Sequence, residues 1–431
     1  MADVLNFKCP CCGATLPFNG QTGKMTCEYC DASFTIDEVK AAQEAEAQNA
    51  KPSDMVWSTQ EPSMIKDENG KVQGYLCPSC GAEMVANENT AATECPYCGN
   101  QAIIPQSFEG LYKPELIIPF SVDKNRAKSQ LSEFVKGKKL LPDSFTEGNR
   151  IQDINGIYVP FWLYSCHAKG EISFNGVKHE KWEDARYHYD RSDHYHLTRG
   201  GEMDFKQIPV DASKQMDDDT MDSLEPFDLG KAVPYEAAYF SGYLADRYDV
   251  SEKEAQPRAN ERVMNTFRDK MRSEVRSYSE VQQTSENIQL SKAKAQYAML
   301  PVWMMSTKYN DKIYTFGING QSGKMVGSLP IDEGKYRKYL LISALISFIV
   351  LQLPVFFFSD GFSCVGEIVA LIVAIIIGFI YAGGLRSGMN TVAHQSRATS
   401  YLDSGTMRMD RPVDRFLYSK TQKYEKNRDK N

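Results

Sequence analysis

Residues 340–383 read LLISALISFIVLQLPVFFF, then SDGFS, then CVGEIVALIVAIIIGFIYAG. The first apolar run, 340–358, has 19 residues and no charge, and the second, 364–383, carries only Glu367. At about 1.5 Å per residue, each run forms a helix roughly as long as a hydrocarbon core is thick. A backbone in lipid must satisfy its own hydrogen bonds, which favours helices. This stretch therefore predicts a C-terminal two-helix transmembrane hairpin, with its flanks, at residues 335–385.

Basic residues flank both runs and are missing from the turn between them. Lys335, Arg337 and Lys338 precede the first run, and Arg386 and Arg397 follow the second. Cytoplasmic flanks of membrane helices are enriched in Lys and Arg. We therefore expect a protein of the cell membrane, with two membrane-spanning helices and with both termini in the cytoplasm.

Two alternatives to a full crossing remain open. The runs could form a buried hairpin of a soluble core, although two such long apolar runs are rare there. They could also form a re-entrant hairpin, because Pro354 interrupts the first run and Glu367 is costly against lipid.

Cysteines dominate the N-terminal part of the 431-residue chain: nine of the eleven precede residue 100. Eight of them form CxxC pairs with 14 residues between the paired motifs, twice over: Cys9, Cys12, Cys27 and Cys30, then Cys77, Cys80, Cys95 and Cys98. Two CxxC turns supply the four thiolates of a tetrahedral metal site. A glycine follows Cys12, as it does Cys80 and Cys98, which favours Cys12 over Cys11 as the ligand.

These spacings predict two zinc ribbons, at 1–36 and 71–105, joined by an acidic helix and linker at 37–70. A disulfide or a redox CxxC is a weaker interpretation in a cytoplasmic chain. Four thiolates close the coordination shell of Zn²⁺ and leave no position for a catalytic water. We therefore predict two structural Zn²⁺ ions as cofactors.

The charge of the ribbons argues against nucleic acid as a partner. The whole chain has a net charge of −7, and neither ribbon carries a stripe of Lys or Arg. Such a stripe is what neutralises phosphates. Binding to nucleic acid therefore stays the second hypothesis, behind contact with proteins.

A second repeat lies in residues 106–334, which we expect to form a β-rich cytoplasmic domain. Residues 158–176 and 299–320 share Pro-x-Trp, an apolar segment and a final Asn-Gly. Asn-Gly is typical of tight β-hairpin turns. The pattern predicts two equivalent β-hairpins in a mainly antiparallel domain with flanking helices. One such helix should begin after Asp123 and end near Lys138 and Lys139, which could be solvated or contact lipid head groups.

The sequence RYHYDRSDHYH places His188, His194 and His196 near two aspartates. Alternation of Tyr and His predicts two strands around an Arg-Ser-Asp turn. Imidazole and carboxylate groups are metal ligands, so a metal-dependent enzyme that uses this region is a third hypothesis. The chain has no phosphate-binding glycine loop and no GxSxG or HExxH motif, and we expect no enzyme activity. Residues 386–431 are predicted to form a basic cytoplasmic tail.

The layout resembles a family of bacterial membrane proteins described as containing a TFIIB-type zinc ribbon. The shared features are twin ribbons, the segments PFWLY (160–164) and IPVDASKQMDDDTMDSLEPFD (208–228), and the late hairpin. Some members carry a primosomal helicase label, which the lack of a Walker motif does not support. The resemblance implies partners of the phage shock protein A type and of the SPFH-domain type, in envelope-stress responses. It carries over only the eight zinc cysteines and no catalytic residue.

The sequence therefore predicts an α+β multidomain protein with two ribbons, a β-rich domain and a membrane hairpin. The expected function is that of a membrane-anchored zinc-ribbon adaptor or scaffold. It would recruit protein partners to the cytoplasmic face of the membrane and would need no small-molecule substrate.

Overall fold

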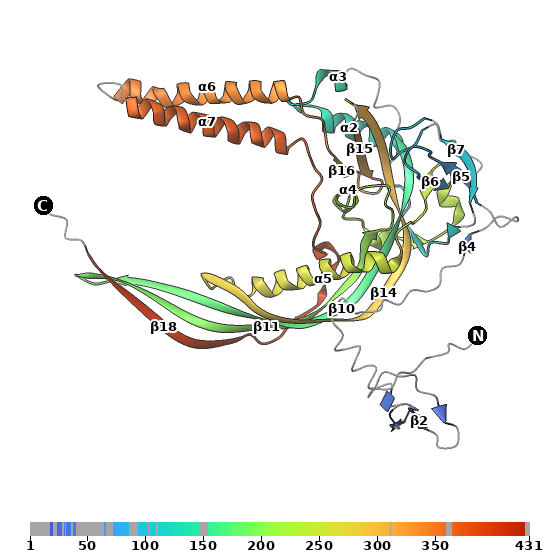
Figure 1. Ribbon diagram of the computed structural model, residues 1–431, viewed down its shortest axis with the longest axis horizontal. Helices are drawn as coiled ribbons and strands as arrows, with labels where there is room; N and C mark the ends of the chain where they lie inside the picture. Colours follow the sequence, from blue (N-terminus) through green and yellow to red (C-terminus); the bar gives the residue numbers. More distant parts are fainter. Residues whose placement is uncertain are drawn as a thin grey trace.

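A computed structural model gives the α+β fold of the chain. It describes residues 18–19, 24–27, 30, 32–35, 38–39, 64–65, 72–85, 94–101, 103–108, 111–146, 154–310, 312–358 and 364–426. Within these ranges one large β-sheet forms the body, and two long helices project from it (Figure 1). A small separate sheet holds the N-terminal strands β1 (Phe18–Asn19), β2 (Lys24–Thr26) and β3 (Ser33–Phe34).

The large sheet has 13 strands and is built around three long ones. These are β10 (Asn155–Glu183), β11 (Tyr187–Asp211) and β14 (Glu280–Tyr309). The shorter strands are β5 (Val72–Leu76), β6 (Glu83–Val85), β7 (Ile104–Phe108), β9 (Leu116–Ile117), β12 (Val233–Pro234), β13 (Leu244–Asp246), β15 (Lys312–Asn319), β16 (Met325–Gly327), β17 (Leu402–Met409) and β18 (Val413–Glu425). A separate pair joins β4 (Met64–Ile65) to β8 (Leu111–Tyr112).

The helices flank this sheet and are spread along the chain. The α-helices with described bounds are α2 (Lys124–Val135), α3 (Asp143–Thr146), α4 (Asp218–Ser223), α5 (Glu252–Ser273), α6 (Glu333–Phe358) and α7 (Cys364–Ser387). Short 3-10 turns lie at Leu229–Lys231, Ala237–Phe240 and Thr399–Tyr401. As predicted, the Asp123 side chain caps the start of α2 by accepting a hydrogen bond from the backbone of Arg126.

The two Pro-x-Trp segments lie side by side at the centre of the sheet. Antiparallel pairing of β10 with β14 sets Pro160 opposite Met299, and Pro301 opposite Tyr158. The repeat is therefore real, but its two copies pair with each other. The body's core lies on both faces of this central pair.

The predicted hairpin at 158–176 is wrong, because β10 runs through it as one continuous strand. The Asn-Gly there makes no turn: a Cβ on Gly176 would lie 2.6 Å from Leu197 and 2.9 Å from Tyr278. This glycine thus permits close packing instead of a reversal. The second copy does form hairpins, at Asn310 between β14 and β15 and after Asn319 between β15 and β16.

The histidine-rich segment is also one strand, so the predicted Arg-Ser-Asp turn is absent. Its residues lie in β11, which pairs with β10 on one side and β18 on the other. The reversal between β10 and β11 comes earlier, where the Asp184 carboxylate accepts hydrogen bonds from the backbone N–H groups of Arg186 and Tyr187. The alternation of Tyr and His residues therefore predicted β structure correctly but placed the turn at the wrong residues.

Two segments predicted to be separate domains are parts of the large sheet. Strand β6 of the second ribbon pairs with β13, which pairs with β10, so the boundary at residue 105 cuts through one sheet. Residues 402–425, within the predicted basic tail, form β17 and β18, and both pair with β11. The C-terminal segment therefore returns from the hairpin and completes the sheet.

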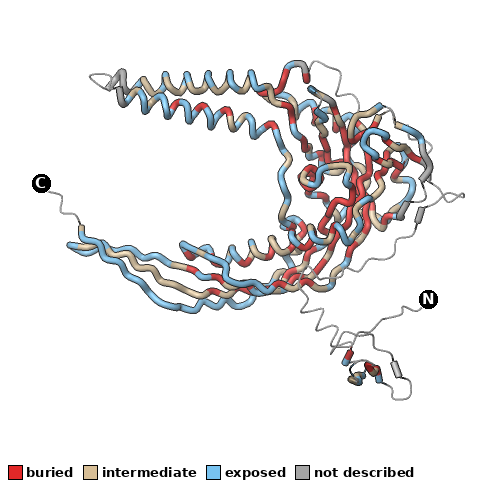
Figure 2. The backbone as a smooth tube through the Cα atoms, in the orientation of Figure 1, coloured by how far each residue is buried: buried red, intermediate tan, exposed pale blue. Residues whose placement is uncertain are grey.

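The long strands extend beyond the body as a curved arm of β14, β10, β11 and β18 (Figure 1). Helix α5 covers one face of its inner part with Val263, Phe267 and Met271, and Val275, just after the helix, joins the same core. A capping box between Ser251 and Glu254 starts this helix. Exposure rises toward the arm's free end and along β18, where no other described segment forms a second layer over the sheet (Figure 2).

Helices α6 and α7 form the predicted hairpin, and both are long and apolar enough to cross a membrane. They pack through small residues: Ala374 and Ala382 are buried, and a Cβ on Gly378 would lie 3.0 Å from that of Ala344. The Gln352 amide donates to the Glu367 carboxylate at 2.6 Å, so this acidic group has a partner within the hairpin. Elsewhere the surface of the hairpin is largely exposed (Figure 2).

Candidate metal centre

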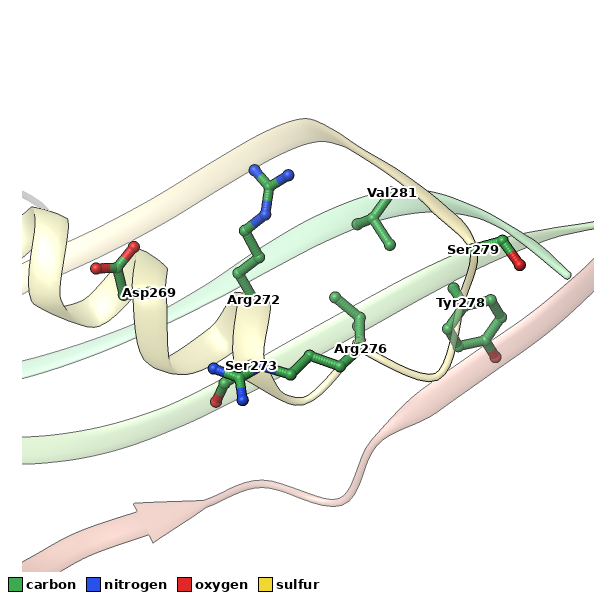
Figure 3. A pocket seen from close by; sticks show the side chains of 8 residues that line it. Asp269, Arg272, Ser273, Arg276, Tyr278, Ser279 and Val281 are labelled. Atoms are coloured by element: carbon green, nitrogen blue, oxygen red, sulfur yellow. The ribbon is translucent and has the colours of Figure 1, made fainter. Parts of the chain in front are cut away.

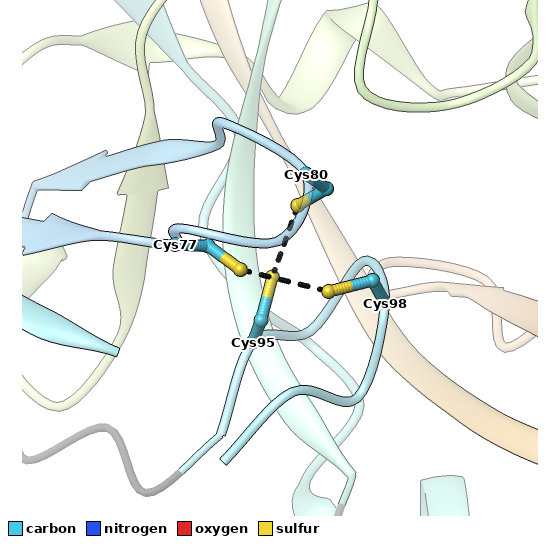
Figure 4. A group of neighbouring side chains, drawn as sticks. All are labelled: Cys77, Cys80, Cys95 and Cys98. Carbon is cyan, nitrogen blue, oxygen red and sulfur yellow. Dashed lines mark hydrogen bonds between the residues drawn. The ribbon is translucent and has the colours of Figure 1, made fainter. Parts of the chain in front are cut away.

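The second ribbon brings its four cysteine sulfurs together in one group (Figure 4). All four Sγ atoms lie within 4.8 Å of one another, with 3.6 Å between Cys77 and Cys98 and 3.7 Å between Cys80 and Cys95. Four sulfurs bound tetrahedrally at about 2.3 Å lie about 3.8 Å apart. The group therefore has the size and the donor set of a site for one metal ion.

Each half of the site is a tight turn that ends in a glycine. The backbone N–H of Gly81 donates to the carbonyl of Cys77 at 2.9 Å, and that of Gly99 donates to Cys95 at 2.8 Å. Their φ angles are +77° and +68°. Glycine takes such angles more readily than other residues, so the expectation that each turn ends in a glycine with a positive φ is confirmed at Gly81 and Gly99.

Two opposing effects set the acidity of the thiols. Burial disfavours the Cys77 thiolate, but hydrogen bonds from the backbone of Cys80 and Ser79 and from the thiols of Cys98 and Cys80 together outweigh burial and lower its pKa to about 7. Burial raises the pKa of Cys80 to about 11 and raises that of Cys95 further. Metal binding must therefore displace protons from these thiols, which makes the affinity fall in acid.

The turn at residues 95–98 is anchored in the body by Tyr97. Its hydroxyl donates to the buried carboxylate of Asp246 at 2.6 Å, and the Ser213 hydroxyl donates to the same oxygen at 2.6 Å. On the other side, the Ser306 hydroxyl donates toward the carbonyls of Pro96 and Tyr97. The metal site and the body therefore share one hydrogen-bond network, which the sequence analysis missed. In the sequence, this network is indicated only by the aromatic residue Tyr97 between Cys95 and Cys98.

Burial dominates the chemistry of this anchor. Because Asp246 is removed from water, its pKa rises to about 7, although the hydroxyls of Ser213 and Tyr97 stabilise the charged form. Burial likewise raises the pKa of nearby Asp211 well above its usual range. A proton held at this cluster therefore reduces the cost of burying two carboxylates together.

The first ribbon is described only in part. Cys27 is buried and Cys30 is exposed, while Cys9 and Cys12 lie outside the described residues. The described core of this unit contains Met25, Cys27 and Val39, with Phe34 against it. It belongs to a sheet separate from that of the body.

The three predicted histidines do not converge. His188 lies 3.1 Å from the Glu183 carboxylate, and the ring of His194 stacks on Tyr418 at 4.3 Å. His196 pairs in register with Asn175 and Arg415. Within the ranges described, the only group of three or more His, Cys, Asp or Glu ligand atoms within 4.8 Å is the cysteine group of the second ribbon. The strand thus spreads the histidines along the arm.

A hollow of about 500 Å³ lies at the C-terminal end of α5 (Figure 3). Arg272 and Arg276 line it, but their guanidinium groups point to different places, the first toward the strands and the second back beside Ser273. An anion would need both groups to converge, and the C-terminal end of a helix disfavours anions. This hollow is therefore a poor anion site.

Comparison with known proteins gives one informative relative. The chain is 30% identical over 359 residues to YdjG, an uncharacterized protein of Bacillus subtilis (strain 168). The match covers 83% of this chain and all of the relative. The chain belongs to the YdjG family. No family model matches the chain, and no solved structure matches it.

Proposed function

We propose that the chain is a membrane-anchored adaptor whose body lies in the cytoplasm. The exposed apolar surface of the hairpin carries this proposal. Leu341 is 66% exposed and Ile380 is 69% exposed, and none of residues 333–353 of α6 is fully buried within the protein. Exposing so large an apolar surface to water is unfavourable. The length of the two helices matches the thickness of a hydrocarbon core, so lipid is the environment that fits them.

The base of the hairpin supports the same orientation. The Lys139 ammonium donates to the Tyr381 hydroxyl at 3.1 Å and lies 5.7 Å from the Tyr339 ring. Lys138 donates to the carbonyl of Gly388, and Arg386 lies over the Tyr336 ring at 5.5 Å. Tyrosines with lysines and arginines are typical of the cytoplasmic membrane interface.

We further propose that each ribbon holds a structural Zn²⁺ ion. Four thiolates suit zinc, and a closed four-sulfur shell leaves no position for a substrate or a catalytic water. In the second ribbon, residues Cys77, Cys80, Cys95 and Cys98 would hold the ion. It would fix both turns and so keep Tyr97 against the body.

The adaptor would recruit proteins to the membrane. The family resemblance implies partners of the phage shock protein A type and of the SPFH-domain type, and a role in envelope stress. The exposed arm supports protein binding, because it offers strand edges and aromatic side chains far from the hairpin's base. In this proposal the cysteine sites stabilise the fold and take no part in catalysis.

Two measurements test this proposal. The full chain should pellet with membranes and resist carbonate extraction, whereas Ile376→Asp, at a lipid-facing position of α7, should weaken this association; Ile376→Leu is the matched control. Purification from detergent-solubilised membranes should then recover a stable protein partner. A wild-type chain that stays in the soluble fraction, or that is purified from membranes without any partner, would overturn the adaptor.

A further inference from the structure

Basic side chains from three parts of the chain meet at the base of the hairpin. Helix α2 lies beside the start of α6, and α7 returns to the same end of the hairpin (Figure 1). In sequence, the residues just after α2 lie about 200 positions before the hairpin. The basic cluster formed in this way contains Lys136, Lys138, Lys139, Lys335, Arg337, Lys338 and Arg386.

Hydrogen bonds fix the segment after α2 against the start of α6. The backbone N–H of Asp332 donates to the carbonyl of Leu140 at 2.9 Å. The Lys335 ammonium donates to the carbonyl of Leu141 at 2.7 Å. The fold therefore sets the place of residues 136–139 relative to the hairpin.

Lys139 is held at the edge of the apolar surface. Its ammonium donates to the hydroxyl of Tyr381 at 3.1 Å and lies 5.7 Å from the centre of the Tyr339 ring. Tyr381 belongs to the apolar run of α7, which ends at Gly383. In a membrane helix, the end of the apolar run lies at the depth of the lipid head groups. The ammonium of Lys139 is thus held at that depth.

Carboxylates neutralise only a small part of this cluster. Asp143 pairs with Lys335 at 2.6 Å. Glu333 lies 3.6 Å from Arg386. The Asp332 carboxylate accepts hydrogen bonds from two backbone N–H groups. No carboxylate of the described chain forms an ion pair with the other five basic side chains, Lys136, Lys138, Lys139, Arg337 and Lys338.

We propose that the basic cluster binds the phosphate group of an anionic phospholipid of the cytoplasmic leaflet, with Lys136 and Lys139 as its principal contacts. The proposal rests on the proposed function, because the membrane hairpin is what places the cluster among lipid head groups. Lysines and arginines gathered directly beside the cytoplasmic end of a membrane helix attract anionic lipids. The bound lipid would connect α2, and with it the body, to the bilayer next to the hairpin.

The lipid preference of the full chain in bilayers tests this site. Spin-labelled phosphatidylglycerol and phosphatidylcholine report how strongly each lipid associates with the chain in phosphatidylcholine membranes. We expect phosphatidylglycerol to associate about threefold more strongly or better, and the double variant Lys136→Gln, Lys139→Gln to lower this ratio at least about twofold. The double variant Lys420→Gln, Lys423→Gln removes the same charge from β18, away from the base of the hairpin, and is the matched control (Figure 1).

A second arm of the experiment separates a lipid from free phosphate. Sodium chloride and sodium phosphate of equal ionic strength should weaken the preference for phosphatidylglycerol equally, because both only screen the charges. A much stronger effect of phosphate would assign the cluster to free phosphate and would overturn the lipid site.

Three further results would overturn it: a wild type without any preference for phosphatidylglycerol, a preference that Lys136→Gln, Lys139→Gln leaves unchanged, or an equal loss in the control variant. These results are distinct from a failure of the membrane anchor. A chain that does not stay in the bilayers contradicts both proposals, whereas a chain that stays there without lipid preference contradicts only the lipid site.

Discussion

The two ribbons have the same cysteine spacing and different structural roles. The first keeps its strands in a small sheet of its own, whereas the second contributes β5, β6 and β7 to the large sheet of the body. Tyr97 of the second ribbon is bound at a buried carboxylate of the body. Ligand spacing therefore defines a metal site without deciding whether that site is an independent module or part of a larger core.

The largest difference should appear when each site loses one ligand. Cys77→Ser should lower the free energy of unfolding of the body by more than about 4 kcal/mol, because metal binding and folding are coupled there. Cys27→Ser should change it by less than about 1 kcal/mol. Thermal unfolding followed by circular dichroism, with metal analysis, measures both.

Each of these two variants should lose one metal ion per chain and remain in the membrane fraction, because the hairpin lies apart from both sites. An equal loss of body stability in the two variants would show that the comparison is wrong. Release of Cys77→Ser from membranes would contradict the structural separation of the metal site from the membrane hairpin.

The anchor between the second ribbon and the body should contribute a smaller amount. Tyr97→Phe leaves the buried Asp246 carboxylate with one fewer hydrogen bond and should cost about 1–3 kcal/mol. Tyr314→Phe is a control within the aromatic cluster around Phe145 and should cost much less. Denaturant unfolding in detergent compares the two, and equal losses would remove the special role of Tyr97.

The proton at Asp246 makes this anchor sensitive to pH. Its pKa is raised from 3.8 to about 7 in the folded state, so the folded state binds more protons in that range. Stability is therefore present at low pH and is lost as pH rises toward 7, by at most about 1.4 kcal/mol per unit.

Asp246→Asn removes this contribution. Relative to the wild type, the variant should gain stability as pH rises from 5 to 8, which melting temperatures across that range would show. A difference between the two proteins that does not change with pH would contradict a raised pKa at Asp246.

Ser306→Ala should give the smallest effect. It removes one hydroxyl that donates to the carbonyls of Pro96 and Tyr97, at a cost of about 0.5–1.5 kcal/mol. Because the contact lies on the turn that holds Cys95 and Cys98, metal release to a chelator should also become faster. Unchanged release would mean that the body does not support that turn.

Local patterns in the sequence predicted local features well. The CxxC spacing brought the four cysteines of the second ribbon together, the glycine rule gave both positive φ angles, and apolar length gave both helices of the hairpin. Each of these features depends on residues close together in the chain. The resemblance to TFIIB-type zinc-ribbon proteins and the partners that it implies stay predictions.

Long-range pairing could not be predicted. Asn175-Gly176 has the sequence of a turn but lies in a strand, because Gly176 packs against Leu197 and Tyr278. The segment around His188 and His194 forms no cluster of metal ligands among the described residues, because its partners come from β10 and from the C-terminal β18. Such contacts join residues far apart in the sequence, and no local pattern records them.

Hydrogen exchange with mass spectrometry, with and without a chelator, tests the central comparison most directly. We predict that metal removal exposes residues 83–85 of the second ribbon and residues 244–246 of the body together, because β6 pairs with β13. Residues 24–26 of the first ribbon should lose protection independently of the body. If residues 83–85 lost protection while 244–246 kept it, the second ribbon would be a separate module and the account would be contradicted.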